Sequence, residues 1–368
     1  MIGAAYLNPT AYGDLTGLNW RVWLLSHIFA DQKFMTIFSI LFGSGILLFT
    51  EKIEFRQHRS GRLHYRRMFW LLIIGVIHGY IFWHGDILYT YAVCGLLAFL
   101  FRKLKPVKLF ITGIFVVSIA SFLYLFFGFT ISYWPAEAYT SNLQFWQPSP
   151  EIIEKELAML RGGFSSQLEY RIPMTLTFQT MVFLIWNGWR AGGLILVGIA
   201  LYKWGILSAG KTKKFYIISA LAGYGIGIPI ILYGVQRNIG AEWLMDYSMF
   251  FGWQFNYWGS LFVSLGHISI VMLCLKSERL KKIKNSFASV GRMAFTNYLA
   301  QTLICTTIFY GHGFGLFGNV DRLSQLMIVI AVSLALIPFS VGWLKYFRFG
   351  PVEWLWRTLT YWKIQPVR

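Results

Sequence analysis

Apolar residues in this chain gather in nine stretches separated by polar connections. Most of them contain 16 to 29 residues, enough to cross a hydrocarbon core of about 30 Å at about 1.5 Å per residue. Lipid offers the backbone no hydrogen-bond partners, so such spans must be helices. We predict an all-α, polytopic integral membrane bundle of about nine transmembrane helices. The predicted spans are Phe34–Thr50, Met68–Trp83, Ile87–Phe101, Leu109–Ile131, Met174–Tyr202, Phe215–Gln236, Met249–Leu275, Val290–Tyr310 and Leu323–Leu344.

Composition supports this interpretation. Hydrophobic residues make up 56% of the 368 residues and charged residues only 13%, whereas a soluble domain carries about 25% charged residues. The apolar stretches are spread evenly, which favours one membrane domain over residues 1–368. The net charge of +18 does not indicate a nucleic-acid partner, because the cations follow the membrane topology.

Basic residues concentrate on alternate connections. The connections 51–67, 102–108, 203–214 and 276–292, together with the tail 345–368, contain 25 of the 33 Lys and Arg residues. The positive-inside rule places this side in the cytoplasm. We therefore expect a multi-pass protein of the bacterial plasma membrane with a cytoplasmic C-terminus. The same cations would contact anionic membrane lipids.

Three further segments have distinct patterns. Residues 1–33 are predicted to be external, with an interfacial helix over Leu15–Phe29. The connection 132–173 is also external and is either a lid over an outward-facing site or a solvated loop with one surface helix. The aromatic and basic tail 345–368 is predicted to be an amphipathic segment on the inner leaflet.

Arg190 interrupts the long span Met174–Tyr202. The span therefore either tilts strongly or breaks near Arg190, because a lone cation at the membrane centre costs about 2.5–3.5 kcal/mol. Arg190 is then either a snorkelling anchor or a functional group facing the bundle interior.

Polar residues inside or beside spans are candidates for function. His78 lies within the second span, and His84 and Asp86 lie in the short turn after it. A histidine beside a carboxylate is the minimal general-base unit, since the carboxylate orients the imidazole and stabilises its protonated form. The alternative is that these groups form structural hydrogen bonds between helices.

Asn297 and Gln301 lie four residues apart and therefore share one face of the eighth span. Their amides could hold a carbonyl group or stabilise an oxyanion. For His267 and Gln254 a structural role is favoured. The sequence contains no phosphate-binding glycine loop and no metal-ligand motif, so no metal is expected.

Four motifs resemble the YeiB-like family of bacterial membrane proteins, whose domain is designated domain of unknown function 418. The first is the run from Lys33 to Gly45, and the second comprises Ile74, Gly75, His78, Gly85, Asp86, Tyr91 and Ala92. The third and fourth are Gly291–Tyr298 with Gln301, and Phe347–Arg357.

This resemblance implies a fold related to the transmembrane acyltransferases, which include the acyltransferase-3 group and the heparan-glucosaminide acetyltransferase type. Those relatives depend on a membrane-embedded or lumen-facing histidine, and His78 with Asp86 belongs to the YeiB-like pattern. The family also carries an additional first helix, so a ten-helix protein whose first helix precedes this sequence is expected.

The first hypothesis is therefore an acyltransferase that modifies an envelope glycan, lipid or small molecule. His78, His84 and Asp86 are the candidate catalytic residues, and acyl-CoA is the expected donor. The candidate substrate-binding residues are Asn297, Tyr298, Gln301, Arg190 and His312. A transporter or flippase with Arg190 as its substrate contact is the alternative, and a lipid-interacting scaffold is the third option. The oligomeric state stays open, with a homo-oligomer as one possibility.

Overall fold

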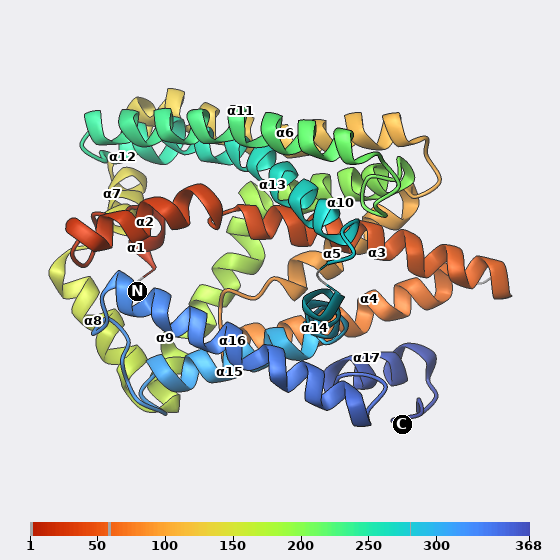
Figure 1. The fold of residues 1–368 in the computed structure, drawn as a ribbon. Coiled ribbons are helices and arrows are strands. Elements are labelled where there is room, and N and C mark those ends of the chain that lie inside the picture. Colours follow the sequence, from red (N-terminus) through yellow and green to blue (C-terminus); the bar gives the residue numbers. More distant parts are fainter. Residues whose placement is uncertain (1–2, 58–59, 280) are drawn as a thin grey trace.

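The computed structural model describes residues 3–57, 60–279 and 281–368, and every regular element within these ranges is a helix (Figure 1). The predicted all-α fold is confirmed. The first half contains α1 (Ala4–Leu7), α2 (Gly17–Phe29), α3 (Lys33–Gln57), α4 (Ser60–Ile77), η1 (His78–Phe82), α5 (Leu88–Phe101), α6 (Pro106–Thr130), η2 (Ile131–Tyr133), α7 (Ala136–Trp146), α8 (Pro150–Arg161) and α9 (Phe164–Thr177). The second half contains η3 (Phe178–Asn187), α10 (Gly188–Lys203), α11 (Lys213–Gly240), α12 (Met245–Tyr247), η4 (Ser248–Gly252), α13 (Trp253–Leu275), α14 (Lys281–Arg292), α15 (Ala294–Phe309), α16 (Arg322–Tyr346) and α17 (Pro351–Tyr361).

Six helical runs among the described residues are long and apolar enough to cross a membrane. They are Gly17–Phe55, Pro106–Tyr133, Phe164–Lys203, Lys213–Gly240, Met245–Leu275 and Arg322–Tyr346. Leu88–Phe101 is apolar but shorter. The predicted spans 68–83 and 290–310 correspond to α4 with η1 and to α15, which do not reach the same length and apolarity. Helices of this length and apolarity are those of a membrane protein. The number of membrane crossings, nine, stays a prediction.

The long span around Arg190 does not break. Helix α9, the π-helical segment η3 and α10 form one run from Phe164 to Lys203. A π-helical segment absorbs extra residues without ending the helix. The run is 40 residues long, about 60 Å at the usual helical rise. It therefore extends well beyond a single hydrocarbon core.

Helix α10 forms the centre of the bundle, where it packs against α3 and α6. Nine consecutive residues from Gly193 to Leu201 are buried. At the crossing with α3, a Cβ on Gly198 would lie 2.0 Å from the carbonyl oxygen of Ile40. Only glycine allows this approach, and such small-residue contacts are typical of helix packing in membranes.

The predicted basic connections meet at one end of the bundle, which we call the basic end. Arg66 donates to the carbonyl of Thr360 on α17, and Arg102 forms an ion pair with Glu54 at 2.8 Å. Lys203 donates to the carbonyl of Leu104, and Arg292 to that of Arg348. Each bond joins two of the five basic segments. These segments therefore lie together at one end of the bundle, as the alternating topology requires.

The remaining connections meet at the opposite end. Asn8 donates to Gln147 at 2.6 Å, and the indole of Trp146 donates to the carbonyl of Trp243. Arg161 on α8 donates to the carbonyl of Phe317. The N-terminus lies at this end and the C-terminus at the other (Figure 1). The cytoplasmic location of the basic end stays a prediction.

Candidate functional site

The site begins in the hairpin of α4 and α5, where the chain turns at the end opposite the basic one. The two helices approach closely, since a Cβ on Gly75 would lie 2.5 Å from the backbone nitrogen of Tyr89. Helix α4 ends in the π-helical turn η1, whose first residue is His78. Such turns are frequent at functional sites because they redirect a side chain.

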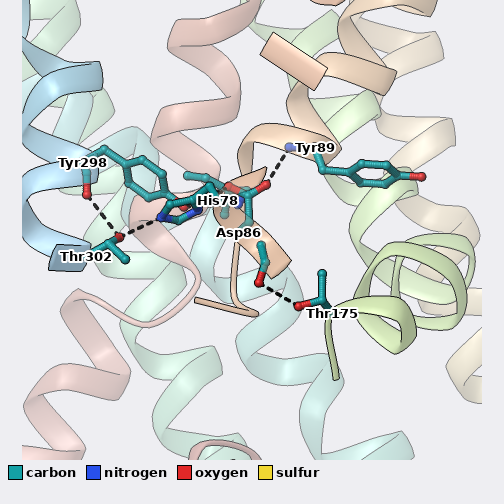
Figure 2. A network of polar contacts seen from close by, with 8 residues as sticks. His78, Asp86, Tyr89, Thr175, Tyr298 and Thr302 are labelled. Carbon is teal, nitrogen blue, oxygen red and sulfur yellow. Dashed lines mark hydrogen bonds and ion pairs between the residues drawn. The ribbon is translucent and has the colours of Figure 1, made fainter. Parts of the chain in front are cut away.

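The hairpin brings His78 and Asp86 together (Figure 2). Nδ1 of His78 lies 2.8 Å from Oδ1 of Asp86, and both side chains are only 2% exposed. The second carboxylate oxygen accepts a bond of 2.8 Å from the backbone nitrogen of Tyr89, at the start of α5. An ionised carboxylate can only accept hydrogen bonds, so a neutral His78 that donates from Nδ1 to Asp86 keeps a free lone pair on Nε2.

Helix α15 supplies the rest of the site. The hydroxyl of Thr302 lies 3.1 Å from Nε2 of His78, and also 3.3 Å from the carbonyl of Tyr298 one turn earlier. The Tyr298 ring packs beside the imidazole, with ring centroids 5.1 Å apart, and its hydroxyl lies 3.4 Å from Oδ1 of Asp86. Hydroxyl, imidazole and carboxylate therefore form one line of hydrogen bonds.

A cavity of about 410 Å³ lies against this line of residues. Ligand sites in proteins usually have about 300–1,000 Å³. Thr302 and Tyr298 line the cavity, whereas His78 does not. Its lining comprises Trp83, Tyr298, Gln301, Thr302, Cys305, Thr306, Phe309, Tyr310 and Phe317. The wall is mainly apolar, and its polar groups lie on α15.

His84 lies apart from the pair. Its ring contacts the rings of Trp83, Tyr170 and Phe178, and Nδ1 is buried without a hydrogen-bond partner among the described residues. Burial, and secondarily the charge of Arg171, lowers the pKa of His84 to about 4. A neutral, enclosed imidazole of this kind can contribute to packing but has no contact with Asp86.

Two other predicted substrate-binding residues point elsewhere. Asn297 is 4% exposed and is held by the carbonyl of Val290 and the hydroxyl of Ser340. His312 lies in the loop after α15, exposed, with Nδ1 2.9 Å from Oε1 of Gln167. Partial desolvation of its ring by neighbouring side chains, and secondarily the charge of Arg171, lowers the pKa of His312. Gln301 and Tyr298 are thus the predicted binding residues that line the cavity.

Arg190 belongs to a second buried polar group. It is 0% exposed and donates to the carbonyl of Tyr257 and to the hydroxyls of Thr36 and Ser260, with distances of 2.7–3.1 Å. Its guanidinium lies 4.3 Å from the centroid of the Tyr257 ring. Arg190 lines none of the three main cavities of the described residues.

Lys33 and Asp31 complete this second group. Lys33 is also 0% exposed and donates to Oδ1 of Asn256, whose amide nitrogen donates to Asp31 at 2.9 Å. Asp31 also forms an ion pair with His27 at 3.2 Å. We call the set Asp31, Lys33, Arg190 and Asn256 the cationic cluster. The hydrogen bonds of these charged groups come from within the bundle, although Nε of Arg190 is buried without a partner among the described residues.

Thr302 was not singled out from the sequence. Its contact with His78 joins residues 224 positions apart, and threonine is common in membrane helices, so its type carries little information. One signal was available: Tyr298, Thr302 and Thr306 repeat every four residues and therefore share a face. The sequence pattern instead indicated Asn297 and Gln301, which precede Tyr298 and Thr302 by one position on the same helix. Among the described residues, no group of three or more His, Cys, Asp or Glu side chains has the arrangement of a metal site.

Comparison with known proteins gives relatives along nearly the full length. The chain is 34% identical over 362 residues to the Uncharacterized protein YeiB of Escherichia coli (strain K12), covering 97% of this chain and 89% of that protein. It is 33% identical over 361 residues to the Uncharacterized protein YxaH of Bacillus subtilis (strain 168), covering 92% and 82%. A third relative, the Uncharacterized 39.9 kDa protein in amylase 3'region of Bacillus acidopullulyticus, is 27% identical over 336 residues.

No solved structure matches the chain significantly. Residues 201–363 match the family described as "Protein of unknown function (DUF418)". This region begins at the end of α10 and includes α15, which supplies Tyr298 and Thr302. The predicted resemblance is therefore confirmed, and the chain belongs to the YeiB-like DUF418 family of bacterial proteins.

Proposed function

We propose that the protein is a membrane-embedded acyltransferase that moves an acyl group onto an envelope glycan, lipid or small-molecule acceptor. The observation that carries the proposal is the pair of His78 and Asp86, enclosed in the bundle and connected through Thr302 to a largely apolar cavity. Acyl transfer needs a group that removes a proton from a hydroxyl or amine and a site that excludes water. The buried pair of His78 and Asp86 and the mainly apolar wall of the neighbouring cavity support the proposal on these two points.

His78 accepts the proton, and Asp86 fixes the orientation of the imidazole and stabilises its positive charge during the transfer. The apolar wall, with Trp83, Phe309 and Phe317, suits an acyl chain or the hydrocarbon part of a lipid acceptor. The amide of Gln301 lies on the same wall and is suited to donate to the oxyanion that forms at the acyl carbon.

The proposed donor is acyl-CoA, delivered from the basic end. Arg66, Arg102 and Lys203 gather there through bonds between neighbouring connections, and clustered cations attract the phosphates of such a donor. In this proposal the basic end faces the cytoplasm of the plasma membrane, where CoA thioesters are made, and the cavity opens toward the outer leaflet.

The test measures acyl transfer by purified protein in nanodiscs. Radiolabelled acyl-CoA of two to sixteen carbons is supplied with an extract of bacterial envelope lipids and glycans. The His78→Ala variant is expected to lower transfer by about 100-fold or more, the usual contribution of a general base.

The matched control is His267→Ala. His267 also lies in a predicted span and pairs with a hydroxyl, that of Tyr224 at 2.8 Å, but it does not line the cavity. This variant should retain transfer within about threefold, as expected of a residue without a catalytic role. Equal activity of wild type and His78→Ala, with both folded, contradicts the proposal.

A further inference from the structure

In the resting site His78 does not line the cavity. Its side chain is 2% exposed. Nδ1 is occupied by Asp86, and the free lone pair on Nε2 faces the hydroxyl of Thr302 at 3.1 Å. Thr302 does form part of the wall. The group of this site that meets a bound acyl donor is therefore the hydroxyl.

Resting on the proposed acyltransferase function, we propose that Thr302 is the nucleophile and carries the acyl group as an ester between two half-reactions. A hydroxyl within hydrogen-bond reach of an imidazole that is oriented by a carboxylate is the arrangement that activates serine and threonine nucleophiles. The proposal is specific to Thr302. Both Thr302 and Thr306 line the cavity and lie within reach of a backbone carbonyl of α15, but among the described residues only Thr302 also lies within hydrogen-bond distance of His78.

In the first half-reaction, Oγ1 of Thr302 attacks the carbonyl carbon of an acyl thioester. Its proton passes to Nε2 of His78 as the carbon–oxygen bond forms. The carbon–sulfur bond then breaks, and the leaving sulfur takes the proton from His78 and departs as a thiol. The acyl group is now an ester of Thr302, and His78 is neutral again.

In the second half-reaction, the acceptor hydroxyl or amine gives its proton to Nε2 of His78 and attacks the ester carbon. The bond from that carbon to Oγ1 breaks, and Thr302 recovers the proton from His78. The product leaves with the acyl group, and no oxidant or other reactant is consumed. Donor and acceptor therefore use the same cavity in turn, which predicts ping-pong kinetics.

A small cavity is consistent with sequential use. Its volume of about 410 Å³ is at the low end for ligand sites. In one-step transfer the site must hold the donor thioester and the acceptor together. In two-step transfer it holds the acyl chain throughout, while the thiol leaves before the acceptor enters.

The experiment uses purified full-length protein in nanodiscs with p-nitrophenyl acetate and p-nitrophenyl octanoate, in the absence of acceptor. These activated esters release a coloured product when the acyl group leaves, so a covalent intermediate appears as a burst of about one equivalent per protein. Mass spectrometry of the peptide around residue 302 then locates the acyl group. Radiolabelled octanoyl-CoA is used in parallel, with label retained on the protein as the readout.

Three variants sharpen the result. Thr302→Val removes the hydroxyl at nearly constant shape and should abolish the burst, while Thr302→Ser should retain it. Thr307→Val is the matched control, because it is the same substitution on the same helix at a residue that does not line the cavity and whose hydroxyl donates to the carbonyl of Leu303 at 2.8 Å. It should retain both the burst and the ester on Thr302. The thermal unfolding midpoint of each variant in detergent verifies folding.

Two contrary outcomes are distinguishable. If folded Thr302→Val transfers octanoyl groups at the wild-type rate, or if the burst acyl group is on another residue, Thr302 is not the nucleophile and transfer occurs in one step or elsewhere. If wild type neither releases p-nitrophenolate nor retains octanoyl label, and transfers nothing to the envelope extract, the acyltransferase function fails and this inference with it.

Discussion

Two buried polar regions of this protein look alike in composition but differ in access. The pair of His78 and Asp86 is connected through Thr302 to a cavity. The cationic cluster contains more ionisable groups than this pair, yet Arg190 and Lys33 are 0% exposed and bonded only to neighbouring helices. Under the proposed function, charge inside a membrane bundle is therefore not a sufficient sign of a reactive site. A reactive site also needs space beside it.

The largest expected effect concerns the cationic cluster. Arg190→Met should lower the free energy of unfolding by about 2–4 kcal/mol, because it leaves buried acceptors without a donor and removes the contact with the Tyr257 ring. Unfolding in a titration with denaturing detergent measures the change.

Arg237→Met is the control for that variant, since Arg237 is exposed and its guanidinium lies 5.8 Å from the Tyr247 ring centroid. A surface substitution of this kind should change stability by no more than about 0.5 kcal/mol. Equal stability of Arg190→Met and wild type removes the structural role assigned to the cluster.

The second prediction compares the two histidine–carboxylate pairs. Asp86→Asn should lower acyl transfer by about 100-fold or more, because an amide no longer stabilises the protonated imidazole of His78. Asp31→Asn alters the ion pair between His27 and Asp31, the carboxylate of the cationic cluster. It should leave transfer within about threefold while lowering stability. Steady-state kinetics in nanodiscs measure the rate of acyl transfer by both variants. A larger loss of transfer in Asp31→Asn than in Asp86→Asn contradicts the prediction.

The third prediction uses pH. His84 has a pKa of about 4 in the folded protein, below the value of about 6.5 for an exposed histidine. Between these values the unfolded chain binds a proton that the folded chain does not, so stability falls as pH decreases from about 6.5 toward 4. His84→Gln should reduce this loss of stability between pH 6.5 and 4 by about 1–3 kcal/mol. Unfolding midpoints measured at intervals from pH 7.5 to 4.5 test this, and parallel curves for both proteins contradict it.

The smallest effect is expected at His312, a residue that the sequence indicated as a binding group. It is exposed and contacts Gln167 rather than the cavity. His312→Ala should change stability by no more than about 0.5 kcal/mol and transfer by less than about threefold. A large loss of transfer would extend the functional site into the loop after α15.

The sequence was informative where the signal is local or repeated. Spans and basic connections repeat along the chain, and contacts such as Arg102 with Glu54 confirm that the basic segments meet. The pairing of His78 with Asp86 was predictable because eight residues and one turn separate them. Thr302 was not predictable, because the packing of α15 against the hairpin decides which of its faces meets His78. The same holds for Arg190, whose partners come from α3 and α13.

The support of α15 comes from a segment beyond the predicted spans. Glu353 on α17 accepts from the backbone nitrogens of Phe295 and Thr296, at 2.7 and 3.1 Å, and so caps the first turn of α15. A carboxylate at that position offsets the positive end of the helix dipole. Because α17 follows α15 in the chain, Glu353 can cap α15 only after synthesis has passed residue 353. The helix that carries Tyr298 and Thr302 therefore gains this support only when the end of the chain has been made and has packed against it.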